Sequence, residues 1–60
     1  MAAKSILGAA EIAADWVFHF LEEMGEYEDA CVQSASDVYK AISGQKMNVE
    51  DILGIEGYDD

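Results

Sequence analysis

Apolar side chains recur at alternating steps of three and four residues over the first 24 positions, and this spacing restricts the fold more than any other feature of the chain. Such a spacing places the side chains on one face of an α-helix. It therefore predicts a helix over residues 4–24, ended by Gly25. Ile12, Trp16 and Phe18 fall outside the main stripe, which makes the apolar arc wider than one partner helix needs. The main stripe, followed by the residues that run beside it, is Ile6, Ala10, Ala13, Val17, Phe20, Met24 and Leu7, Ala14, Leu21.

The rest of the chain predicts two further helices. Residues Cys31, Ala35, Val38 and Ile42 repeat the helical spacing, with Tyr39 alongside, and predict a helix over 27–43 that Gly44 closes. Asn48 is a favourable N-cap for a short helix over 49–53, followed by Gly54. The expected fold is all-α. It is a single small domain over 1–60, built as a helical hairpin with a short third helix and an acidic C-terminal tail at 55–60.

Composition excludes several classes of protein. The 60 residues include 13 carboxylates against three lysines, giving a formal net charge of -10. A hydrophobic content of 52% is too high for a disordered acidic tail. A single cysteine rules out an internal disulfide, and the uninterrupted apolar runs are far too short to cross a bilayer. The N-terminal residues do not resemble a signal peptide, so we expect a cytoplasmic protein.

Catalytic and metal-binding motifs are missing from the sequence. The only histidine is His19 and the only cysteine is Cys31, which lies on the predicted apolar stripe of the second helix. No phosphate-binding loop or zinc-protease motif occurs. The carboxylates between residues 22 and 29 do not follow the spacing of a calcium-binding loop. We therefore expect a protein that is not an enzyme and that uses no cofactor and no metal.

The arrangement of the carboxylates is what points to a function. Glu11, Asp15 and Glu22 fall on one side of the first predicted helix, with Glu26 continuing the line and no cation opposite. Like charges in such positions cost stability, and carboxylates at a helix C-terminus oppose the helix dipole. Rises of about 6 Å and about 10 Å separate the three along an ideal helix, comparable with phosphates on a nucleic-acid strand. The plainer interpretation is a solvated face that serves solubility alone.

In its small size, strong negative charge and helicity over the whole chain, the sequence resembles the small acidic phage-encoded anti-CRISPR and anti-restriction proteins that mimic DNA. The resemblance implies an inhibitor that evades host defence by covering the basic groove of a nucleic-acid-binding protein, such as a CRISPR surveillance complex. It also implies action in the cytoplasm of a bacterial host cell. Because an acidic surface is repelled by phosphate backbones and anionic lipids, we expect no direct binding to nucleic acid or membrane. The residues expected to contact the partner are Glu11, Asp15, Glu22, Glu23, Glu26, Glu28, Asp29, Asp59 and Asp60, with the aromatic residues Trp16 and Phe18.

Two other functions fit the same sequence. One is a helical-hairpin homodimer or adaptor subunit that uses the apolar arc of the first helix, an architecture similar to Rop-type dimers. The lysines are scattered, so the RNA binding of that family is not expected here. The other is an antitoxin or immunity protein that covers a basic nuclease. The pattern leaves open whether Trp16 and Phe18 lie in the core or at an interface, because two packings of the first helix satisfy it.

Overall fold

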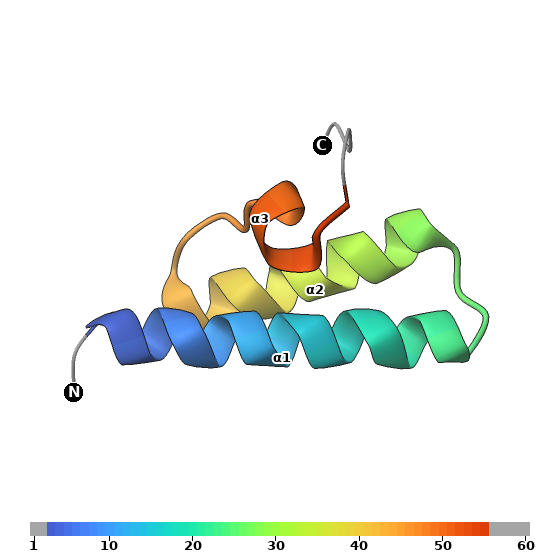
Figure 1. Cartoon of the computed structure of the whole chain (residues 1–60). Helices are drawn as coiled ribbons and strands as arrows, with labels where there is room; N and C mark the ends of the chain where they lie inside the picture. Colours follow the sequence, from blue (N-terminus) through green and yellow to red (C-terminus); the bar gives the residue numbers. More distant parts are fainter. Residues whose placement is uncertain (1–2, 56–60) are drawn as a thin grey trace.

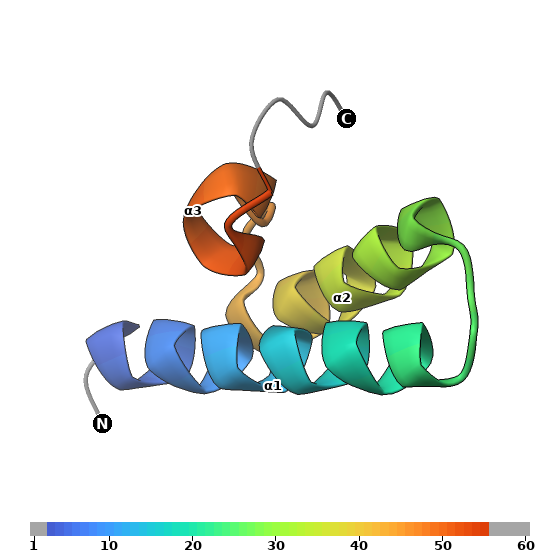
Figure 2. The same cartoon turned by 45° about the vertical axis from the view of Figure 1, so that its right-hand side comes forward.

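The computed structural model describes residues 3–55, with side chains from Ile6 onward. It contains three helices, α1 (Ala3–Glu23), α2 (Glu28–Ser43) and α3 (Val49–Leu53), and no strand within the described residues. α1 and α2 run in opposite directions as a hairpin, and α3 lies above α1 at the side of α2 (Figures 1 and 2). The predicted all-α fold is confirmed, and each helix begins and ends within one residue of its predicted position.

The turn between α1 and α2 is built around Gly25. Its φ of +88° lies in the left-handed region, which only glycine adopts at little cost. The Gly25 N–H donates to the Glu22 carbonyl at 3.0 Å, and the Glu26 N–H donates to the Leu21 carbonyl at 3.1 Å. These two bonds form a Schellman motif, which satisfies carbonyls at the end of α1 and turns the chain back. The predicted helix end at this glycine is confirmed.

The short helix α3 is fixed at both ends by its own backbone and cap. The Asn48 side-chain oxygen accepts a hydrogen bond from the Asp51 N–H at 3.1 Å, as expected of an N-cap residue. Gly54 ends the helix with a φ of +71°, and its N–H donates to the Glu50 carbonyl. A five-residue helix has few internal hydrogen bonds, so its position depends on burial of Val49 in the core.

The core lies between α1 and α2 and is closed by residues from α3 and the linker before it. Small side chains dominate the helix contact, since Ala10 and Ala14 of α1 and Cys31 and Ala35 of α2 have no exposed surface. Small residues let two helices approach closely, which increases packing contacts along the whole interface. The remaining buried residues are Phe18, Val32, Tyr39, Met47 and Val49.

The main stripe of α1 does not coincide with the buried face of the helix. Phe20 and Met24 are each 62% exposed, and Ile6 is also exposed. The buried face consists of Ala10 from the main stripe together with Ala14 and Phe18 from outside it. On α2, Ile42 was expected in the core but is exposed. The physical reason is that one hairpin partner covers only part of an apolar arc as wide as that of α1, so residues such as Phe20 and Met24 stay outside.

None of the helices in the described range is long and apolar enough to cross a membrane.

Two phenylalanines on opposite sides of α1 can test which face of the helix packs against α2. Phe18→Ala should lower the free energy of unfolding by about 3–5 kcal/mol, because it opens a cavity in the core. Phe20→Ala should change it by about 0.5 kcal/mol or less, because that side chain is exposed. Urea unfolding followed by circular dichroism gives both values, and Phe18→Leu supplies a milder variant if Phe18→Ala does not fold. Equal losses at both positions would contradict the observed packing.

Candidate partner-binding surface

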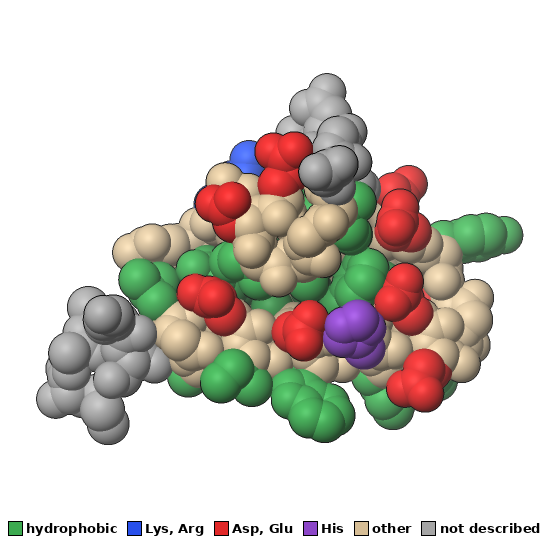
Figure 3. Space-filling model, in the orientation of Figure 1, with side chains coloured by type: hydrophobic (Ala, Val, Ile, Leu, Met, Phe, Trp, Pro, Cys, Tyr) green, Lys and Arg blue, Asp and Glu red, His purple; other side chains and the backbone are tan. Residues whose placement is uncertain are grey.

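Three carboxylates form a row along one face of α1, which we call the acidic row: Glu11, Asp15 and Glu22. All three are exposed, and Figure 3 shows red side chains along α1 with the histidine among them. His19 Nε2 lies 3.2 Å from Asp15 Oδ1, and His19 Nδ1 lies 3.5 Å from Glu22 Oε1. These contacts are solvent-exposed and therefore weak, but they hold His19 between two members of the row. No lysine or arginine is paired with the row in any recorded ion pair of the described side chains.

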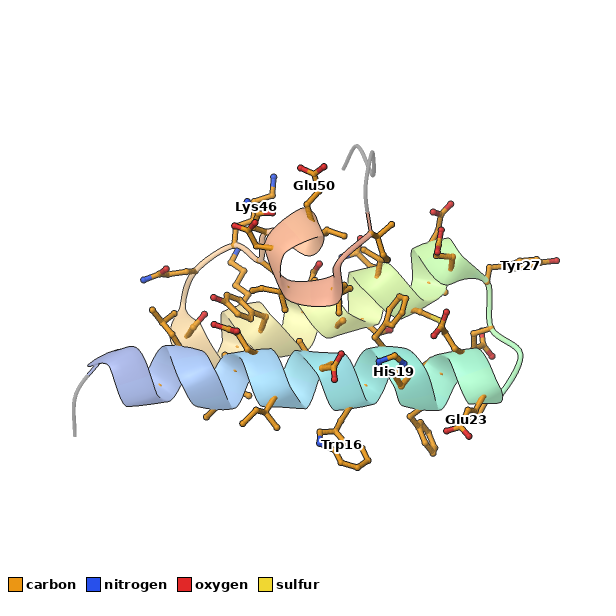
Figure 4. The ribbon with its side chains drawn as sticks, in the orientation of Figure 1. Trp16, His19, Glu23, Tyr27, Lys46 and Glu50 are labelled. Atoms are coloured by element: carbon orange, nitrogen blue, oxygen red, sulfur yellow. The ribbon has the colours of Figure 1, made fainter. Side chains whose placement is uncertain are left out.

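The other predicted carboxylates are divided between two places. Glu26 lies in the turn after α1, and Glu28 and Asp29 form the first turn of α2, where the helix dipole favours negative charge. Glu23 does not join the acidic row. It projects from the same side of α1 as Trp16, away from α2 and α3 (Figure 4). Asp59 and Asp60, also predicted to contact a partner, lie outside the described residues.

The site holds no arrangement of ligands suited to a metal ion. Among the described residues, no group of three or more histidine, cysteine, aspartate or glutamate side chains is placed to hold one. Exposed carboxylates spread along a helix attract cations of any kind without enclosing them. The charge of this surface attracts basic groups electrostatically.

Cys31 lies beneath the acidic end of the hairpin and is fully buried. Its thiol is 3.8 Å from the Glu26 carbonyl oxygen, to which it donates. Burial raises the pKa of the Cys31 thiol above its ordinary value of 9.0, and the carboxylates of Glu22 and Glu26 raise it further. The thiol is therefore neutral and inaccessible at neutral pH, which is the behaviour of a small core residue rather than of a nucleophile.

A continuous apolar surface runs along the side of α1 that faces away from α2. We call it the outer stripe: Ile12, Trp16, Phe20 and Met24, each between 62% and 72% exposed. Trp16 projects away from both other helices in Figure 4. A shallow hollow lined by Trp16, Val17, Phe20 and Leu21 lies within this surface. Single exposed apolar residues are ordinary, but four at successive helical turns form a contiguous patch typical of interfaces.

The structure separates the two aromatic residues expected to contact a partner. Phe18 is buried in the core at 5% exposure, so its predicted place in the binding surface is wrong, whereas Trp16 is 72% exposed. Phe20 and Met24 were placed on the main apolar stripe but were not among the residues expected to contact a partner, although both are exposed. The available signal was their spacing of four and eight residues from Trp16, which places both on the same side of a helix as Ile12 and Trp16.

The described lysines lie on a different part of the molecule. Lys40 of α2 and Lys46 of the linker line one groove together with Asp37 and Met47. In Figure 4, Lys46 lies beside α3, on the side of the molecule opposite Trp16. These two lysines are thus away from the acidic row of α1, in a region that also contains carboxylates such as Asp37.

Comparison with models of protein families, with curated proteins and with solved structures found no match to this chain.

The raised pKa of Cys31 predicts how stability changes in alkaline solution. The unfolded thiol ionises at a lower pH than the folded one, so the unfolded chain binds fewer protons in that window. The free energy of unfolding should then fall as the pH rises above 9.0. Cys31→Ala should make the free energy of unfolding depend less on pH in this range. Lysines and tyrosines also titrate here, but they are common to both proteins, so their contribution cancels in the comparison. Urea unfolding at pH 7.5 to about 10.5 measures it; parallel curves for the two proteins would contradict the prediction.

Proposed function

We propose that this chain is a small acidic inhibitor that binds the basic nucleic-acid-binding surface of another protein, in the manner of anti-CRISPR DNA mimics, and blocks access of nucleic acid. The observation that carries the proposal is the acidic row on α1, Glu11, Asp15 and Glu22, with no described lysine beside it. The spacing of these carboxylates along the helix axis is comparable with that of phosphates. The partner is then a basic protein such as a CRISPR surveillance complex, with no direct binding to nucleic acid.

The two surfaces of α1 have separate tasks in this proposal. The net charge of -10 attracts a basic site over a distance and speeds association. Exposed charge pairs contribute little to the final affinity because water and salt screen them. The outer stripe supplies the apolar contact that holds the complex together, with Trp16 as its largest side chain.

A second candidate function is that of a homodimer or adaptor subunit, and the exposed outer stripe itself favours it. In that case the acidic row serves solubility alone. An antitoxin or immunity protein that covers a basic nuclease is a special case of the first proposal, because the same row would meet the same kind of partner surface.

The proposal can be tested with two variants of equal net charge. Glu11→Lys/Glu22→Lys reverses the ends of the acidic row, and Asp37→Lys/Glu50→Lys makes the same charge change on exposed residues elsewhere. Immobilised protein is exposed to a bacterial lysate and then eluted with double-stranded DNA. The wild type and the control variant should release a nucleic-acid-binding protein, and the row variant should release about tenfold less or none.

The row variant should remain folded, because a lysine at position 22 in the last turn of α1 suits the helix dipole. Circular dichroism checks this directly. The inhibitor proposal would be refuted if the captured partner is not eluted by DNA and binds the row variant as well as it binds the wild type. That result would favour the adaptor function.

A further inference from the structure

We infer that the outer stripe of α1 is a docking surface for an amphipathic α-helix of another protein, one that carries lysine or arginine along one edge of its apolar face. The inference rests on the proposed function and names the part of the partner that α1 would contact.

The geometry of the stripe matches a helix. Its members follow one another at intervals of four residues, so they form a ridge that rises about 6 Å per step. Side-chain rows of this kind pack into the grooves of a second helix. Ala9 and Ala13 lie beside the larger side chains and allow close approach over the N-terminal half. The hollow between Trp16 and Phe20 has room for an apolar side chain of the partner.

Charge decides which kind of helix fits. One edge of the outer stripe is bordered by carboxylates, with Asp15 and Glu22 on the adjoining face and Glu23 at the C-terminal end. The opposite edge carries the uncharged residues Ala13 and Val17. A partner helix therefore gains most when its cations lie along a single edge. Nucleic-acid-binding proteins commonly carry lysine and arginine clustered on one face or along a helix.

The same charges argue against a second copy of this chain on the stripe. In an antiparallel two-fold pair of α1 helices, like edges meet, so carboxylates would face carboxylates. In a parallel pair, each acidic edge would face Ala13 and Val17, which offer no cation. Lys40 and Lys46 lie in a separate groove, and Lys46 is on the side away from Trp16. Dimerisation would also double a charge that is already -10 per chain.

Fluorescence of Trp16 reports binding at the outer stripe directly, because Trp16 is the only tryptophan of the chain and lies within the stripe. Three synthetic helical peptides with identical leucine faces serve as probes. The first carries lysines along one edge, the second glutamates at those positions, and the third the same lysines on the face away from the leucines. The first should shift Trp16 fluorescence to shorter wavelength and bind about tenfold tighter than the other two, with the difference shrinking at high salt.

Two variants locate the contact. Phe20→Ser should weaken binding of the lysine-edged peptide by about tenfold or more, whereas Ile42→Ser, an exposed apolar residue of α2, should leave it unchanged. Equal affinity for all three peptides, or binding without a shift of Trp16 emission, would overturn the inference. So would sedimentation of the protein alone as a dimer with Trp16 already buried, because a second copy would then occupy the stripe.

Failure of this inference can be told apart from failure of the proposed function. If the lysine-edged peptide binds as expected but no partner that DNA can displace is captured, the docking surface is supported and the proposed inhibitor function is refuted. If capture of such a partner survives Phe20→Ser unchanged, the inhibitor stands and the docking surface is refuted.

Discussion

The close antiparallel contact between α1 and α2 is the constraint on which the rest of the structure depends. It is made by alanines and a cysteine with no exposed surface, so the two helices approach closely and leave little space between them. Phe18 is the largest residue that this interface takes in from α1. A chain of 60 residues buries only part of its apolar surface, and residues 3–55 contain no third long helix that could cover the remainder. The outer stripe is the direct result.

The surface of α1 therefore divides into three arcs with different roles. One arc packs on α2, one carries the acidic row, and one is apolar and faces solvent. Neither exposed arc contributes to stability as an ordinary helix surface would. Among the described side chains, the ion pairs of the row are made with His19 and not with a lysine, and the side chains of the outer stripe remain largely in contact with water. Binding of α1 to a basic, apolar surface of another protein would offset both the repulsion among the carboxylates and the exposure of the apolar side chains to water. This agreement between two independent features is why α1, rather than α2 or α3, is the element to which we assign the function.

The helix ends were predictable and the choice of the buried arc was not. Gly25, Gly44, Asn48 and Gly54 act locally, so each could be recognised from its own neighbours in the sequence. The buried arc of α1 depends on which side meets α2, and apolar residues on both sides satisfied the same helical spacing. For this reason the pattern did not show that Phe18 is buried and that Phe20 is exposed. The acidic row followed from spacing alone, because helical geometry fixes residues on one face once the helix exists.

The small size of α3 has a consequence for the motions of the molecule. A helix of five residues is not stable by itself, and it contributes Val49 to the core while Met47 enters from the linker before it. Local opening of this segment breaks few hydrogen bonds and leaves the hairpin in place, so its free energy lies well below that of global unfolding. Amide hydrogens of α3 should accordingly exchange with solvent much faster than those in the middle of α1. In the opened state the hairpin would display a second apolar surface, on the side of the molecule where the lysines lie.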